Sequence, residues 1–424
     1  MGEIDKYVNT VCQQMRWKKA RQRVFDEMTT HIVDSRDAYI GQGFDEQAAT
    51  AQAIADTGDA AVLGASFDRV HRPKPQWGMI GAVIGFLVLG IVIDLFMHDT
   101  WNDNGRLVFT GIGLMAMLAA YFVDFTILGK YPWVIISAFL VLMAFLAWIS
   151  VDIGFARGQA LSLIFPLVFV TCIFALRDTG IKGIAVSGAA YAVLCVISGL
   201  LFFASFFHFS VVGMAILLVV IWRNWFSASK YLKILGTFLL IIPFTALAIW
   251  GVLFESRSRI AIAFNPHLEP LGHGFSALQA RRVLSGAVLL GEGGVNIYWL
   301  PDARHNFFLT SIASRYGWLP FIAIVCALAA FIAIGFIRCF KQKSGLGFLV
   351  SFAVIATFSI QVVTFVAFNL GFTLVMMTLP LISPGNSALL ANLVLVGFML
   401  SVFRTGDAVP RHKPPQSYSS PQVQ

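Results

Sequence analysis

One polar stretch in an otherwise apolar chain holds the side chains best suited to chemistry. It runs FNPHLEPLGHGFSALQ, from 264 to 279, and contains the carboxylate Glu269, the imidazole His273 and the amide Gln279. A carboxylate on a polar loop can take a proton from a hydroxyl group, as a general base does. From spacing alone, the commoner role of such a residue is a turn or helix-start carboxylate exposed to water. His273 can carry a proton or bind a metal ion, but a lone exposed histidine usually does neither.

Five arginines surround this stretch: Arg257, Arg259, Arg281, Arg282 and Arg304. A guanidinium group pairs with two phosphate oxygens at once, so a cluster of arginines favours an anionic ligand. Each arginine taken singly is explained as well by contact with lipid head groups, or by pairing with Glu255 or Glu292. The five together favour a phosphate-bearing substrate.

The elements that must position these residues are membrane-spanning helices. The 424 residues are 58% hydrophobic and only 12% charged, more apolar surface than a soluble domain can bury. We therefore predict an all-α polytopic membrane protein with about ten transmembrane helices. The predicted spans are 78–97, 107–125, 132–150, 159–176, 183–204, 209–225, 233–254, 306–338, 346–370 and 386–404. The eighth is too long for one crossing, so we expect its first residues, HNFFLTSIASRYGW, to form an interfacial helix.

Basic residues mark the predicted orientation. They gather in alternate loops and in the C-terminal tail, among them Lys130, Arg177, Arg223 and Lys341. The positive-inside rule then places both termini in the cytoplasm and residues 255–305 outside. Long loops on a membrane scaffold tend to carry function, and this is the only long one predicted. The basic excess follows loop bias, which gives little support to nucleic-acid binding.

The two ends of the chain differ from the membrane part. Residues 1–76 hold 11 of the 22 acidic and 10 of the 30 basic residues, and their pattern predicts a small helical domain and linker. They resemble the prefix domain that precedes many bacterial permeases, which implies a cytoplasmic adaptor; a helical cap that aids insertion is the alternative. Residues 406–424 are rich in Pro, Ser and Gln, which predicts a disordered cytoplasmic tail. The five cysteines have no spacing typical of a metal site or a disulfide framework.

Three motifs carry a resemblance to a known family. EPLGHGFSALQARRVLSGAVLLGEG resembles the large outer loop of the SEDS family, the RodA/FtsW/SpoVE cell-wall polymerases. LPDARHNFFLTSIASRYGWLP and LPLISPGNSALLANLVLVGFMLS resemble the two family motifs that follow. The three occur in family order, and the resemblance covers residues 78–405 with an N-terminal permease-prefix-like domain before it.

The resemblance implies a bacterial peptidoglycan glycosyltransferase of the cytoplasmic membrane, acting in cell shape, division or sporulation. The family transfers hexosyl units from an undecaprenyl diphosphate donor, lipid II, and commonly pairs with a class B penicillin-binding transpeptidase. Glu269 stands where the family has its essential aspartate. Arg281 is the main candidate for pyrophosphate contact, and further candidate substrate residues are Arg282, Arg304, Gln279, His273, Arg257 and Arg259. The sequence specifies no cofactor and leaves a role for a divalent cation open.

Several positions depart from the family pattern, so two other functions stay open. The chain lacks the charged pair that many family members have near the fourth span. It also lacks their Gln-Pro-Asp-Leu-Gly stretch after the fifth span, where this chain has ISGLLFFASFFHFS. One alternative is a SEDS homologue that has lost catalysis and acts as a regulatory membrane partner. The other is a flippase for a lipid-linked precursor. Two acids within spans, Asp94 and Asp124, are best explained by solvation near the ends of their helices.

Overall fold

The computed structural model describes residues 2–97, 104–149, 160, 162–201, 203–227, 229–238, 257–295, 300–303, 305–383 and 386–405. Helices dominate these residues and no strand occurs among them, which confirms the all-α prediction. The chain divides into two compact units. The first consists mainly of Met1–Pro75, with Gln342–Gly345 and the chain from Phe403 onward, and the second of Gln76–Lys341 and Leu346–Val402.

Four helices make up the N-terminal part of the first unit. They are α1 (Glu3–Gln13), α2 (Lys18–Gly41), α3 (Glu46–Thr57) and α4 (Ala60–His71). Val8, Val24, Met28 and Ile32 bury their side chains in one core. Asp45 caps α3, because its carboxylate accepts a hydrogen bond from the N–H of Ala48 at 3.4 Å.

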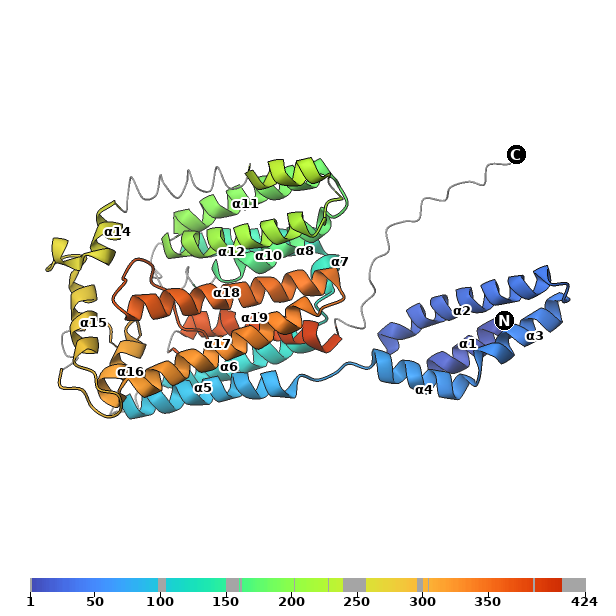
Figure 1. Ribbon diagram of the computed structural model, residues 1–424, viewed down its shortest axis with the longest axis horizontal. Coiled ribbons are helices and arrows are strands. Elements are labelled where there is room, and N and C mark those ends of the chain that lie inside the picture. Colours follow the sequence, from blue (N-terminus) through green and yellow to red (C-terminus); the bar gives the residue numbers. More distant parts are fainter. Residues whose placement is uncertain are drawn as a thin grey trace. The chain divides into compact units, whose positions relative to one another are not determined.

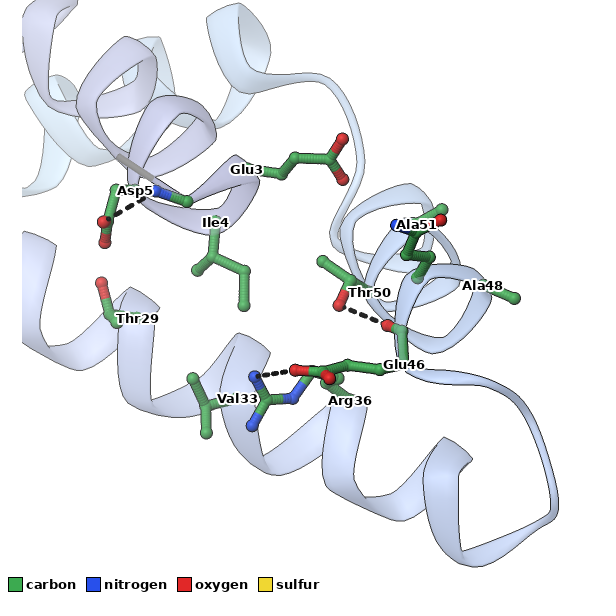
Figure 2. Close-up of a pocket in the computed structure, with 12 residues that line it drawn as sticks. Glu3, Ile4, Asp5, Thr29, Val33, Arg36, Glu46, Ala48, Thr50 and Ala51 are labelled. Carbon is green, nitrogen blue, oxygen red and sulfur yellow. Dashed lines mark hydrogen bonds and ion pairs between the residues drawn. The ribbon is translucent and has the colours of Figure 1, made fainter.

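A groove of about 930 Å³ opens between α1, α2 and α3 (Figure 2). Glu3 and Asp5 line it from α1, and Glu46 lines it from α3. Arg36 of α2 approaches Glu46 across the groove, with Nη1 3.9 Å from Oε1. An exposed pair at this distance contributes little to stability.

The second unit is a bundle of apolar helices (Figure 1). Among its described residues, six helices are long and apolar enough to cross a membrane: α5 (Trp77–Met97), α11 (Ile181–Leu201), α12 (Phe203–Trp222), α17 (Trp318–Phe340), α18 (Gly345–Asn369) and α19 (Asn386–Thr405). Three shorter apolar helices accompany them: α6 (Asn104–Phe122), α8 (Pro132–Ile149) and α10 (Phe165–Ala175). A short helix, α7 (Ile127–Lys130), joins α6 to α8.

Nine of the predicted spans thus coincide with helices, and most of the seventh, 233–254, lies outside the described residues. The prediction that 306–338 begins with a separate helix is confirmed. The chain forms two helices there, α16 (Phe308–Tyr316) and α17, separated at Gly317. Phe308–Ser314 are all buried in protein, and the interfacial position expected for α16 stays a prediction.

The centre of the bundle is formed by α18 and α19, whose apolar segments are 72% and 78% buried. A reciprocal pair of amide hydrogen bonds joins them: Gln361 Nε2 donates to Asn392 Oδ1 at 3.0 Å, and Asn392 Nδ2 donates to Gln361 Oε1 at 3.1 Å. Both side chains are buried. Buried amides that satisfy each other in this way fix the facing registers of the two helices.

Candidate functional site

The polar stretch around Glu269 folds as two helices joined by a tight turn. Helix α14 (Arg257–Phe264) leads into a 3-10 turn, η1 (Pro266–Leu268), and α15 (Phe275–Ser285) follows. The backbone N–H groups of Gly272 and Gly274 both donate to the carbonyl oxygen of Glu269, at 3.1 Å each. A Cβ atom on Gly274 would lie 2.1 Å from the carbonyl oxygen of Pro266, so only glycine fits there.

Glu269 presents its carboxylate on the outside of this turn. Its side chain is exposed, and Oε2 lies beside Gly272, 3.1 Å from where a Cβ atom on that glycine would be. His273 is exposed on the same turn. The backbone hydrogen bonds fix the position of the residue that carries the carboxylate, while the carboxylate stays accessible to a ligand.

Arg281 is held by protein groups. Its Nη2 atom donates to the carbonyl oxygens of Ala263, at 2.9 Å, and Gly371, at 3.1 Å. Its guanidinium carbon lies 5.2 Å from the centre of the Phe372 ring, close enough for a cation–π contact. The expected contact between Arg281 and a pyrophosphate stays a prediction, but this side chain already joins α15 to α14 and to the residues after α18.

The other candidate residues divide by exposure. Arg282 is exposed and next to Arg281 on α15, and Gln279 is half-buried on the same helix. Glu269 and His273 thus lie on the turn, and Gln279, Arg281 and Arg282 lie on α15, which follows it. Arg304, and the side chains of Arg257 and Arg259, lie outside the part of the chain that the structure describes.

A small apolar core lies beneath α15. Ala280, Leu300, Phe307 and Phe368 are buried together, and the rings of Phe307 and Phe368 have centroids 4.9 Å apart. This core packs α15 onto the ends of α16 and α18. The candidate residues therefore sit on elements that are fixed by side-chain packing rather than on a free loop.

Asn369, at the end of α18, is a hydrogen-bond hub that the sequence does not reveal. Its Oδ1 accepts from the backbone N–H of Thr310 at 2.9 Å, and its Nδ2 donates to the carbonyl oxygen of Asn306 at 3.0 Å. The Thr310 hydroxyl also donates to the Asn369 carbonyl oxygen at 2.8 Å. Both Thr310 and Asn306 are far from Asn369 in the chain, so no local pattern could identify the hub.

Asp94 contradicts the expectation of solvation at a helix end. It is 12% exposed, and its Oδ2 lies 3.3 Å from Nη1 of Arg106, which is 5% exposed. The Nη2 atom of Arg106 donates to the carbonyl oxygen of Ile382 at 2.7 Å. Two charges removed from lipid and water need each other, and this pairing overrides solvation at the helix end. Asp124, the second acid within a span, is half-buried. Its Oδ1 accepts a hydrogen bond from the backbone N–H of Thr126 at 3.2 Å.

A family profile for FtsW, RodA and SpoVE, described as "Cell cycle protein", matches residues 76–407. A probable peptidoglycan glycosyltransferase FtsW from Geobacter metallireducens is 24% identical over 352 residues, which cover 76% of this chain and 90% of that protein. The same-named protein of Trichlorobacter lovleyi is 27% identical over 186 residues, 42% of this chain and 47% of that protein. The chain thus spans about half the length of this second relative.

Two solved structures share the fold. A chain from a peptidoglycan synthase complex, described as coordinating polymerization and crosslinking, aligns with a TM-score of 0.57 and 21% identity. A mutant of the Rod shape determining protein RodA from Thermus thermophilus aligns with a TM-score of 0.51 and 19% identity. Each alignment covers 78% of this chain and 98% of the other. Because the family profile matches most of the sequence, the chain belongs to the FtsW, RodA and SpoVE family of membrane proteins, the SEDS family.

Proposed function

We propose that this protein is a peptidoglycan glycosyltransferase that polymerises lipid II at the outer face of the bacterial cytoplasmic membrane. The observation that carries the proposal is the exposed carboxylate of Glu269 on a glycine-fixed turn, directly before the arginine-bearing helix α15. Relatives named as peptidoglycan glycosyltransferases support the same activity.

In the proposed reaction, Glu269 acts as the general base. A hydroxyl group of the acceptor sugar attacks the anomeric carbon of the donor and transfers its proton to the carboxylate. The new glycosidic bond forms as the bond from the anomeric carbon to the lipid diphosphate breaks, and the diphosphate leaves with both electrons of that bond. The configuration at the anomeric carbon is inverted.

The leaving diphosphate needs a positive group near it. Arg282 is exposed on α15 and has a guanidinium available at the surface, so we assign the phosphate contact to it first. Arg281 is hydrogen-bonded to two backbone carbonyl groups, which leaves fewer of its N–H groups for a ligand. Arg304 belongs to the same predicted group of cations.

The proposal extends to location and partner. The basic residues in alternate loops support cytoplasmic termini and an outer location for residues 255–305. A transpeptidase of the class B penicillin-binding type is the expected partner, because one structural neighbour belongs to a synthase complex that couples polymerization to crosslinking.

Incubation of the purified full-length protein with lipid II in liposomes tests this function. We expect glycan chains from the wild-type protein and none from Glu269→Gln, which keeps the shape of the side chain and removes its charge. Absence of polymer from the wild-type protein, in a preparation that is folded and monodisperse, contradicts the proposal.

The same material separates the two alternatives. A flippase would move labelled lipid II across the liposome membrane without forming polymer. If the protein is a regulatory homologue without catalysis, cells that carry the Glu269→Ala variant would grow normally. Cells that carry a variant without residues 1–76 would not.

A further inference from the structure

The residues between α18 and α19 form a buried segment without regular structure. In this 370–383 segment, Val375, Met377 and Leu379 are buried, with exposures of 5%, 2% and 1%, and the residues between them are less buried. Leu381 has a φ of 67°, in the left-handed region that leucine rarely adopts. A backbone of this kind persists next to membrane helices only where surrounding protein holds it.

The first end of the segment is held by Arg281. The Nη2 atom of Arg281 donates to the carbonyl oxygen of Gly371, as well as to that of Ala263 in α14. Gly371 has a φ of 86°, and a Cβ atom on it would lie 2.7 Å from Cγ of Arg281. Glycine at 371 therefore makes room for the arginine, and the arginine joins the segment to the helices on either side of Glu269.

The second end is held by Arg106 in the same manner. Its Nη2 atom donates to the carbonyl oxygen of Ile382 at 2.7 Å, while Nη1 faces the Asp94 carboxylate. A Cβ atom on Gly90 would lie 2.5 Å from Nη2 of Arg106 and 2.5 Å from the carbonyl oxygen of Ile382. A glycine again opens the space in which a guanidinium reaches a backbone carbonyl group.

We propose that Arg281 and Arg106 are positioning residues, which hold the two ends of the 370–383 segment and thereby fix the Glu269 turn relative to the transmembrane helices. The proposal rests on the proposed glycosyltransferase function for its kinetic consequence, because a displacement of about 1 Å at a reacting group costs roughly 100-fold in rate. The hold on the segment itself is independent of that function.

The hold is measured by labelling a cysteine inside the segment. Met377→Cys places a thiol at a buried position, which a polar maleimide reaches only when the segment is released. Arg281→Gln, Gly371→Ala and Gly90→Ala are each introduced into this background, and labelling at residue 377 is followed by peptide mass spectrometry without substrate. The native Cys339 is fully buried in α17 and reports general unfolding in the same sample.

Gly90→Ala and Arg281→Gln each have a matched control. Gly85→Ala lies in the same helix as Gly90, and its Cβ atom would meet nothing within 4 Å. Arg315→Gln removes an exposed guanidinium from α16. An alanine in the middle of a helix normally favours the helix over glycine, so release of the segment by Gly90→Ala reflects the contact of residue 90 with Arg106 and the Ile382 carbonyl oxygen.

We expect the three variants to raise labelling at residue 377 on the order of tenfold, with Cys339 still protected and both controls unchanged. In lipid II polymerisation we expect kcat to fall on the order of tenfold or more at nearly constant KM, since the variants displace a catalytic group without removing a substrate contact. The glycine variants are decisive here, because neither glycine has a side chain that could touch the substrate.

Two results overturn the proposal. One is labelling at residue 377 that stays at the wild-type level in all three variants. The other is a raised KM for Arg281→Gln with normal kinetics for Gly371→Ala, which makes Arg281 a direct substrate contact. A wild-type protein that forms no polymer contradicts only the glycosyltransferase function. In that case the labelling at residue 377 alone tests whether Arg281 and Arg106 hold the segment.

Discussion

Exposure separates the charged side chains around Glu269 into two kinds. Glu269 and Arg282 are exposed, whereas Arg281 is half-buried and bound to two carbonyl oxygens. Sequence motifs treat these residues alike, because a motif records residue type and spacing only. Their different roles depend on the path of the chain at Ala263 and Gly371, which lie far from Arg281 in sequence.

The carboxylate at position 269 tolerates one change in length. Glu269→Asp keeps the charge and moves it back by one methylene group, so we expect polymerisation to continue at a reduced rate. Initial rates of lipid II extension measure this. Activity of Glu269→Asp as low as that of Glu269→Gln would show that placement matters as much as charge at this turn.

Cys12 provides a pH-dependent test in the N-terminal helices. Burial raises the pKa of the Cys12 thiol above its usual 9.0, and Asp26 adds to this while Arg21 opposes it. Because the folded state favours the protonated thiol, stability from this group is complete below pH 9 and declines as pH rises above it. We expect iodoacetamide to modify Cys12 more slowly than an unfolded thiol between pH 8 and about 9.5. Equal rates for the native and the urea-unfolded chain would contradict the burial of Cys12.

At the scale of elements, long apolar runs were sufficient to predict most helices, and the length of the run at 306–338 predicted that it begins with a separate helix. The spans at 78–97 and 346–370 match α5 and α18 closely, because a run of about 20 apolar residues has one stable structure in lipid. The run at 306–338 contains Gly317, with a φ of 94°, whose Cβ atom would meet the carbonyl oxygen of Leu289 at 2.6 Å. That contact comes from another part of the chain, so the sequence predicted the separate helix but not the packing around Gly317 at its end.

The junction of α16 and α18 depends on Asn369. Asn369→Leu leaves the N–H of Thr310 and the carbonyl oxygen of Asn306 without their partner, at a cost of about 1–3 kcal/mol for each buried group. We expect a clear fall in the apparent Tm in detergent. The control is Thr364→Val, because that hydroxyl bonds within its own helix, to the carbonyl oxygen of Ile360 at 2.6 Å. An unchanged Tm for Asn369→Leu would contradict the role of the hub.

At the scale of the whole molecule, the division into an N-terminal helical part and a membrane part follows from composition. Residues 1–76 hold 21 of the 52 charged residues, and the boundary between the compact units falls between Pro75 and Gln76. Composition could not predict which side chains contact residues far away in the sequence. Asp94 is an example, since its partner Arg106 also reaches Ile382, 276 residues further along the chain.

The N-terminal helices have a core of their own, built from Val8, Val24, Met28 and Ile32. Deletion of residues 1–75 should therefore leave the membrane unit folded and lipid II polymerisation in vitro within a few-fold of the full-length rate. Rates measured in the same liposomes test this. Complete loss of polymer from a folded, monodisperse deletion variant would assign these helices a part in catalysis.

The most direct test of the account compares two loop carboxylates. Initial rates of lipid II polymerisation are measured for Glu269→Gln and for Glu292→Gln, an exposed acid of the same loop that serves as the matched control. We expect the rate to fall by about 100-fold or more for Glu269→Gln, the contribution expected of a general base, and to stay near normal for Glu292→Gln. Near-normal polymerisation by Glu269→Gln would contradict this expectation.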